Sequence, residues 1–158
     1  MKKAGLVAML LMIQASHVMA TDDAQQDKGF WYVQTSVYTK HYSPDPDHNN
    51  NQDLIGIERN QASGWVFGGA TFRNSFRQRS NYAYAGKRYE STEYPVYLKL
   101  TGGLLEGYSG QYKDKIPLNH FGIAPVIIPS IGAHYGPLAA ELVFLGANAA
   151  MVTTGIRF

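Results

Sequence analysis

His41 and Ser75 are the residues whose types and positions in this sequence best suit chemistry on an ester. A histidine that reaches a serine hydroxyl is the minimum arrangement for a base-activated nucleophile or for histidine-assisted acyl transfer. The two residues are far apart in the sequence, and each stands at the end of a segment predicted to be a strand. Whether they meet therefore depends on how those strands are arranged.

The elements that must position them are short segments rich in aromatic and β-branched residues, separated by turn residues. Several alternate with a period of two; Val96, Leu98 and Leu100, for example, share one face of a segment. No helical periodicity of comparable strength is present. The pattern predicts eight strands, at 30–41, 53–60, 64–73, 81–90, 95–107, 121–134, 137–144 and 149–158.

Eight strands of about ten residues fit an all-β fold, an eight-stranded antiparallel transmembrane β-barrel of the outer membrane. A soluble, lipocalin-like barrel would show the same alternation and is the alternative. Two features favour the membrane. The chain ends on an aromatic residue, Phe158, as bacterial outer-membrane barrels do. The connections at 61–63 and 91–94 are short, whereas those at 42–52 and 108–120 are long and polar, as expected for periplasmic turns and outer loops.

This topology brings the candidate residues to one rim. If the first strand starts on the periplasmic side, His41 and the Asn74-Ser75 pair both lie at the extracellular rim. His48 and His120 lie in outer loops and are alternative bases. His134 adjoins a turn at the opposite rim and is a poor candidate.

Composition and the N-terminus limit the setting. The chain has 158 residues, 16% of them charged, and no cysteine, which excludes disulfides and thiolate chemistry. Residues 1–20 have a charged start, an apolar run and a small residue at the cut site, so we predict a cleaved signal peptide. Its Lys2 and Lys3 account for the formal charge of +2, so nothing favours nucleic acid. A polar lead-in at 21–29 precedes a barrel domain at 30–158.

The sixth predicted strand is apolar on both faces. Val126 and Ile128 are predicted to point into the barrel, which suits a hydrocarbon chain better than water. Pro125 and Pro129 remove two backbone donors that face the same neighbouring strand. Weakened pairing there predicts a lateral opening for a lipid tail; a distorted but closed wall is the alternative.

Five blocks of this sequence together resemble the PagP family of outer-membrane lipid A palmitoyltransferases. The resemblance runs in order from about Trp31 to Phe158 and is thin between the blocks. The blocks are the rim at His41, the pair Asn74-Ser75, the run Tyr89-Glu90-Ser91-Thr92, residues 124–137 and the terminal Ile156-Arg157-Phe158.

The resemblance implies an eight-stranded barrel that transfers a palmitoyl chain from a phospholipid donor to lipid A without a cofactor. It implies that His41 and Ser75 are catalytic and that Gly86 lies near the floor of the acyl pocket. It also implies that Pro125 or Pro129 forms a lateral gate. The expected partners are the donor, the acceptor, outer-membrane lipids and the barrel assembly machinery, and we expect a monomer.

Two features depart from the family. Asn74 stands where better-known members have Asp, so a compensating charge would come from Asp45, Asp47 or Glu58. The lead-in is too short and polar for the amphipathic helix of those members. Whether Ser75 forms an acyl-enzyme stays open. The alternative functions are a lipid A deacylase barrel and a non-enzymatic structural or lipid-binding barrel.

Overall fold

The computed structural model describes residues 29–158; the predicted signal peptide 1–20 and residues 21–28 of the lead-in lie outside the described residues. Each predicted strand is present, with ends within two residues of those predicted from the sequence. The strands are β1 (Phe30–His41), β2 (Ile55–Asn60), β3 (Trp65–Arg73), β4 (Arg79–Glu90), β5 (Val96–Glu106), β6 (Ile123–Tyr135), β7 (Leu138–Leu145) and β8 (Ala149–Arg157).

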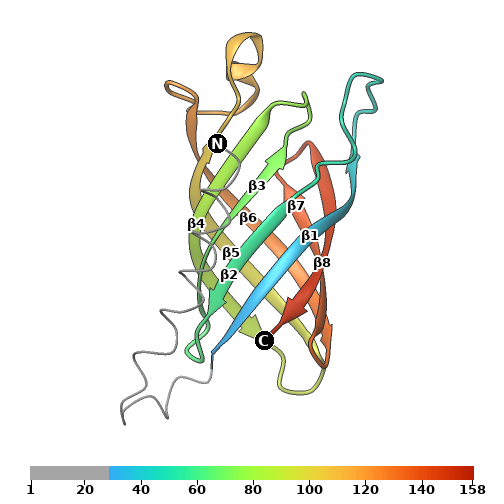
Figure 1. The fold of residues 1–158 in the computed structure, drawn as a ribbon, viewed down its shortest axis with the longest axis vertical. Helices are drawn as coiled ribbons and strands as arrows, with labels where there is room; N and C mark the ends of the chain where they lie inside the picture. Colours follow the sequence, from blue (N-terminus) through green and yellow to red (C-terminus); the bar gives the residue numbers. More distant parts are fainter. Residues whose placement is uncertain (1–28) are drawn as a thin grey trace, which may run out of the picture.

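The strands form a closed antiparallel barrel in sequence order, as predicted (Figure 1). β1 pairs with β8 from Tyr32 to His41 and so closes the ring. The closure extends past the last strand, since Trp31 and Phe158 exchange both backbone hydrogen bonds, of 2.7 and 2.9 Å. A closed ring leaves no sheet edge exposed.

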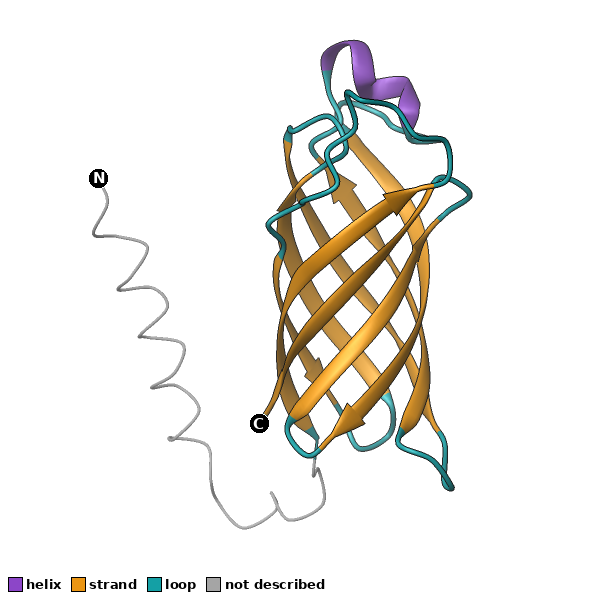
Figure 2. Cartoon of the chain, turned by 90° about the vertical axis from the view of Figure 1, so that its right-hand side faces the viewer, coloured by secondary structure: helices purple, strands orange, loops and turns teal. Residues whose placement is uncertain are grey.

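The two rims differ in the length of their connections (Figure 2). The turns after β2, β4 and β6 are short, whereas 42–54 and 107–122 are long and meet at the opposite rim, which we call the outer rim. The second loop contains a 3₁₀ helix, η1 (Gly110–Lys115), that the sequence reading did not predict. No helix among residues 29–158 is long and apolar enough to cross a membrane.

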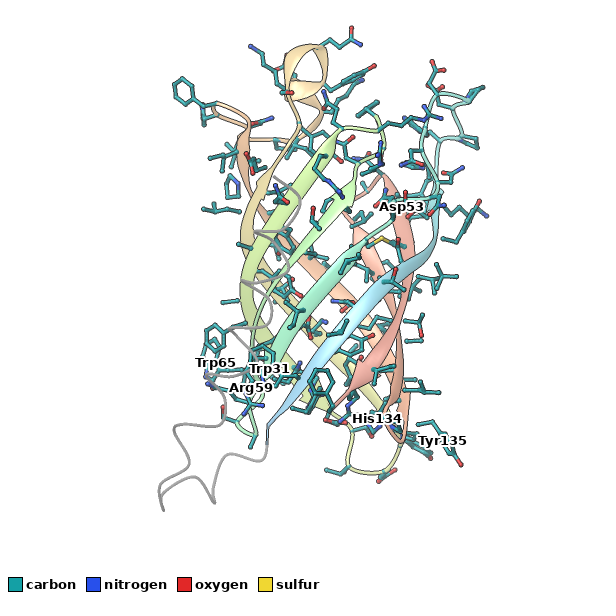
Figure 3. The ribbon with its side chains drawn as sticks, in the orientation of Figure 1. Trp31, Asp53, Arg59, Trp65, His134 and Tyr135 are labelled. Carbon is teal, nitrogen blue, oxygen red and sulfur yellow. The ribbon has the colours of Figure 1, made fainter. Side chains whose placement is uncertain are left out.

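The outside of the barrel is apolar. Large hydrophobic side chains project from every strand, among them Ile57, Leu98 and Ile127, at 49%, 56% and 72% exposure. Exposed aromatic side chains gather where the strands meet the short-turn rim, and Figure 3 shows three of them at that end. The members of this aromatic ring are Trp31, Trp65, Tyr89, Tyr94, Tyr135 and Phe158.

The inside of the barrel is polar in its lower half, toward the short-turn rim, and is held by a buried ion cluster. Lys99 donates hydrogen bonds of 2.7 Å to both Glu58 and Glu141, which come from strands on different sides of the barrel. Tyr84 donates to Glu58 at 2.7 Å and Tyr97 donates to Glu141 at 2.9 Å. We call Glu58, Lys99 and Glu141 the ion layer. It cross-links β2, β5 and β7 through the barrel interior.

Glycines make room for the tyrosines of this layer. A Cβ added at Gly132 would lie 2.2 Å from the Tyr97 ring, and one at Gly68 would lie 2.8 Å from the Tyr84 hydroxyl. These two positions therefore need glycine because a large ring lies directly across the backbone.

We expect Lys99→Met to lower the free energy of unfolding by about 3–5 kcal/mol, because it leaves two buried carboxylates without their shared cation. Urea unfolding of the purified protein in detergent micelles measures the change. Lys40→Met, the same substitution at an exposed position on β1, is the control and is expected to change little. Equal stabilities for the two variants would contradict the role of the ion layer.

Candidate functional site

His41 and Ser75 meet at the outer rim, as their positions predicted. His41 is the last residue of β1 and is buried, and Ser75 follows β3 by two residues. His41 Nε2 lies 2.7 Å from Ser75 Oγ. β1 and β3 are both antiparallel to β2 and therefore both run outward, which brings a base and a hydroxyl to one point.

Asn50, which the sequence reading missed, occupies the other side of the imidazole. Its Oδ1 lies 2.9 Å from His41 Nδ1. Asn50 belongs to the loop 42–54, in a run of three asparagines where no periodicity indicates which one points inward. The amide-rich loop that directly follows His41 was the only signal available.

Aromatic rings cover the pair from the loops. The His48 ring packs 4.4 Å from the His41 ring, and Phe76 stacks on Tyr112 of η1 at 4.1 Å. Tyr108 lines the same cavity as Ser75, and burial raises the pKa of its phenol above the usual value. Tyr108 therefore stays protonated at neutral pH and is a hydrogen-bond donor at the mouth of this cavity.

Asn74 is fully buried and faces away from His41. Its Oδ1 accepts from the Phe76 and Gln78 N–H groups at 2.9 and 3.1 Å, and its Nδ2 donates to Ser80 at 3.1 Å. This is an Asx-type turn that closes the β3–β4 connection. The structure does not bring Asn74 to His41, and it shapes the turn that presents Ser75.

Two of the three carboxylates considered as substitutes for a missing charge, Glu58 and Asp45, have other partners. Glu58 belongs to the ion layer inside the barrel. Asp45 accepts from the backbone N–H of Asp47 in the exposed part of loop 42–54. The neutral Asn50 fills the place where a carboxylate was sought.

The remaining histidines of residues 29–158 lie where they were predicted. His48 lies in the outer loop 42–54 against His41, and His120 lies in the other long loop, where its backbone bridges to Ile123. His134 is at the short-turn rim, 2.6 Å from Glu90 (Figure 3). Of these three, only His48 contacts the candidate pair.

A cavity leads from Ser75 and Tyr108 into the barrel. Its apolar lining comes from strand positions in the outer half of the barrel and from Leu54, the residue before β2, whereas the ion layer lines its inner end. The apolar lining residues are Leu54, Ala70, Phe72, Leu105, Ile128, Val143, Leu145 and Met151.

The three predicted pocket residues have different positions. Ile128 lines the cavity as expected. Val126 shares the inward face of β6 but is not among the lining residues. Gly86 does not line the cavity either, and a Cβ there would lie 2.2 Å from the Leu100 carbonyl oxygen. Gly86 thus allows close strand packing, the ion layer lines the inner end of the cavity, and a role for Gly86 near the pocket floor stays a prediction.

The wall beside Pro125 and Pro129 is paired on one side only. β6 pairs with β5 from Ile123 to Ala133, but with β7 only from Ser130 onward. Both prolines therefore lie in the stretch that lacks a ladder to β7. A hollow in the wall at Pro129 touches outward residues such as Leu100 and the inward Lys99.

Within the described chain no three His, Asp or Glu side chains gather as metal ligands would. The arrangement is instead a base, a hydroxyl and an amide in one hydrogen-bonded line above an apolar cavity. It is suited to acyl transfer from an ester.

Comparisons with known proteins give little beyond the fold. No family model matches the chain, and no curated protein matches it. Among solved structures, it is similar to Ail, the attachment invasion locus protein of Yersinia pestis, in complex with the heparin analogue sucrose octasulfate. The two share 14% identity at a TM-score of 0.47, over 82% of this chain and 97% of Ail. A similarity at this level says nothing about what this chain binds or does.

We expect Asn74→Ala to lower the free energy of unfolding by about 1–3 kcal/mol, because two backbone N–H groups and Ser80 lose their partner. Asn51→Ala, an exposed loop neighbour, is the control and is expected to be near neutral. Thermal unfolding in detergent compares them. Unchanged stability of a folded Asn74→Ala protein would contradict this role of Asn74 in the turn.

Proposed function

We propose that this protein is an outer-membrane acyltransferase that moves a palmitoyl chain from a phospholipid to lipid A. The observation that carries the proposal is the 2.7 Å contact between His41 Nε2 and Ser75 Oγ at the mouth of an apolar cavity. A base and a hydroxyl are the groups that ester chemistry needs, and the lining suits a hydrocarbon chain.

The outer surface supports a membrane location. A soluble protein rarely exposes contiguous apolar area on this scale, whereas a membrane barrel requires an apolar band bordered by aromatic residues. The exposed hydrophobic side chains and the aromatic ring at the short-turn rim have that arrangement. With the short-turn rim on the periplasmic side, as in outer-membrane barrels, His41 and Ser75 lie on the side of the outer leaflet.

The part of β6 before Ser130, which has no ladder to β7, supports entry of the acyl chain through the side of the barrel. Removing two backbone donors at Pro125 and Pro129 weakens the wall at the depth of the apolar cavity. A lipid tail that passes there would reach Ser75 without its headgroup leaving the interface. The donor ester would then lie beside His41.

The acceptor and the chain length follow from the resemblance to the PagP family. A lipid A hydroxyl is the expected acceptor, and palmitate is the expected chain. A deacylase is the second candidate, since the same pair and the same cavity would serve if water took the acyl group. The two activities change the mass of lipid A in opposite directions.

Lipid A from cells that express the protein is expected to gain one acyl mass, and His41→Ala or Ser75→Ala is expected to abolish the gain. Mass spectrometry of extracted lipid A measures it. Ser63→Ala, in a short turn at the other rim, is the control and retains activity. Loss of one acyl mass would favour the deacylase, and no change with folded protein in the outer membrane would favour a non-enzymatic barrel.

We expect Ala70→Phe to shorten the transferred chain by two or more carbons, because Ala70 lines the cavity and each excluded methylene loses about 0.8 kcal/mol. Chain lengths are read from lipid A spectra with donors of mixed acyl composition. Ala83→Phe makes the same change on the exposed face of β4 and is expected to leave the length unchanged. An unaltered length in Ala70→Phe would mean that the chain does not occupy this cavity.

A further inference from the structure

The side chains of Asn50, His41 and Ser75 form one continuous hydrogen-bonded line. Asn50 Oδ1 lies 2.9 Å from Nδ1, and Ser75 Oγ lies 2.7 Å from Nε2. An amide oxygen only accepts, so Nδ1 carries the proton in this arrangement. Nε2 then has a free lone pair, and the Ser75 hydroxyl donates to it.

The backbone fixes Asn50 to the strand that carries His41. The Asn50 carbonyl accepts from the Thr39 N–H at 3.0 Å, two residues before His41 on β1. The neighbouring Asn49 N–H donates to the Ser75 carbonyl at 2.8 Å. Two backbone bonds thus tie the loop to both partners of the line.

From this geometry we propose that Ser75 is the nucleophile of a covalent acyl-enzyme and that Asn50 is the positioning residue that keeps His41 in the reactive tautomer. The inference rests on the proposed ester chemistry and assigns its order of steps. Among the described side chains, the hydroxyl hydrogen-bonded to Nε2 is that of Ser75. Direct deprotonation of a lipid hydroxyl by His41 would first have to break this bond.

In the first step Ser75 Oγ attacks the donor ester carbonyl and its proton passes to His41 Nε2. The ester C–O bond then breaks, and the lysophospholipid oxygen leaves with that proton. In the second step an acceptor hydroxyl attacks the acyl-Ser75 ester, again giving its proton to Nε2. Ser75 Oγ recovers the proton as it leaves, so enzyme and protons return to their initial state.

The first test is labelling of the purified, folded protein in detergent micelles with a long-chain alkyl fluorophosphonate, which reacts with activated serines. We expect one covalent adduct, located on Ser75 by peptide mass spectrometry. His41→Ala is expected to slow labelling at least 100-fold, and Ser63→Ala to leave it unchanged. Absence of an adduct, an adduct at another serine, or equal rates with and without His41 would overturn the proposal.

The second test concerns Asn50. We expect Asn50→Ala to lower the maximal labelling rate at least tenfold with little change in the probe concentration for half-maximal rate, since His41 loses its orientation and not its substrate site. Asn50→Asp is expected to restore most of the rate. Asn51→Ala is the matched control. A wild-type rate in Asn50→Ala, or no rescue in a folded Asn50→Asp protein, would overturn the role of Asn50.

The pH profile separates orientation from a merely structural role. A carboxylate in Asn50→Asp favours the charged imidazole, so the acidic fall-off of the labelling rate is expected to move upward by about one pH unit. The other titratable side chains around the line, His48 against His41 and Tyr108 against Ser75, are unchanged in the variant. An unshifted profile would contradict direct contact between residue 50 and His41.

The two proposals fail in different ways. Labelling of Ser75 with no change in cellular lipid A would overturn the acyl transfer to lipid A and leave the nucleophile assigned. Acyl gain on lipid A with no adduct and no acyl-Ser75 in acid-quenched protein incubated with phospholipid would retain the activity and overturn the covalent route.

Discussion

Closure of the sheet between β1 and β8 is the constraint on which the rest of the structure depends. Once every strand pairs on both sides, alternate residues must point in or out around the whole ring. The same closure delivers the outer ends of β1 and β3 to one rim, where His41 and Ser75 contact each other. The positions of His41 and Ser75 at the rim therefore depend on the strand pairing along the whole barrel.

The ion layer makes the two halves of the barrel interior chemically different. Ions can be held in a protein interior when partners satisfy them, and Lys99 with two carboxylates and two tyrosines meets that condition. Placed in the lower half, the layer leaves the outer half free for apolar side chains. The outer end of the cavity thus suits a hydrocarbon chain. The inner end does not, because methylene groups there would contact the charged side chains of the ion layer.

The sequence predicted the elements well and the side-chain contacts only in part. Period-two alternation located the eight strands, and antiparallel order then placed His41 beside Ser75. Asn50 was missed because loop backbones carry no period, so nothing distinguishes it from Asn49 and Asn51. Asn74 was predicted from its place in the family pattern, yet its side chain accepts from the backbone of the turn after β3 and does not reach His41. Gly86 was assigned to the pocket floor through the resemblance. A glycine is also required where two strand backbones pack closely, and the sequence does not distinguish these two reasons.

Asn50, the third residue of the hydrogen-bonded line with His41 and Ser75, is neutral, and this affects how the site would work. A carboxylate next to His41 would stabilise the charged imidazole, but in the proposed lipid site it would have to be desolvated. Asn50 avoids that desolvation and contributes orientation alone. Its effect then depends on where the loop 42–54 holds it, through backbone bonds to Thr39 and Ser75. In the proposed function the chemistry of the pair therefore depends on the order of this loop, which lies at the outer rim beside His41 and Ser75.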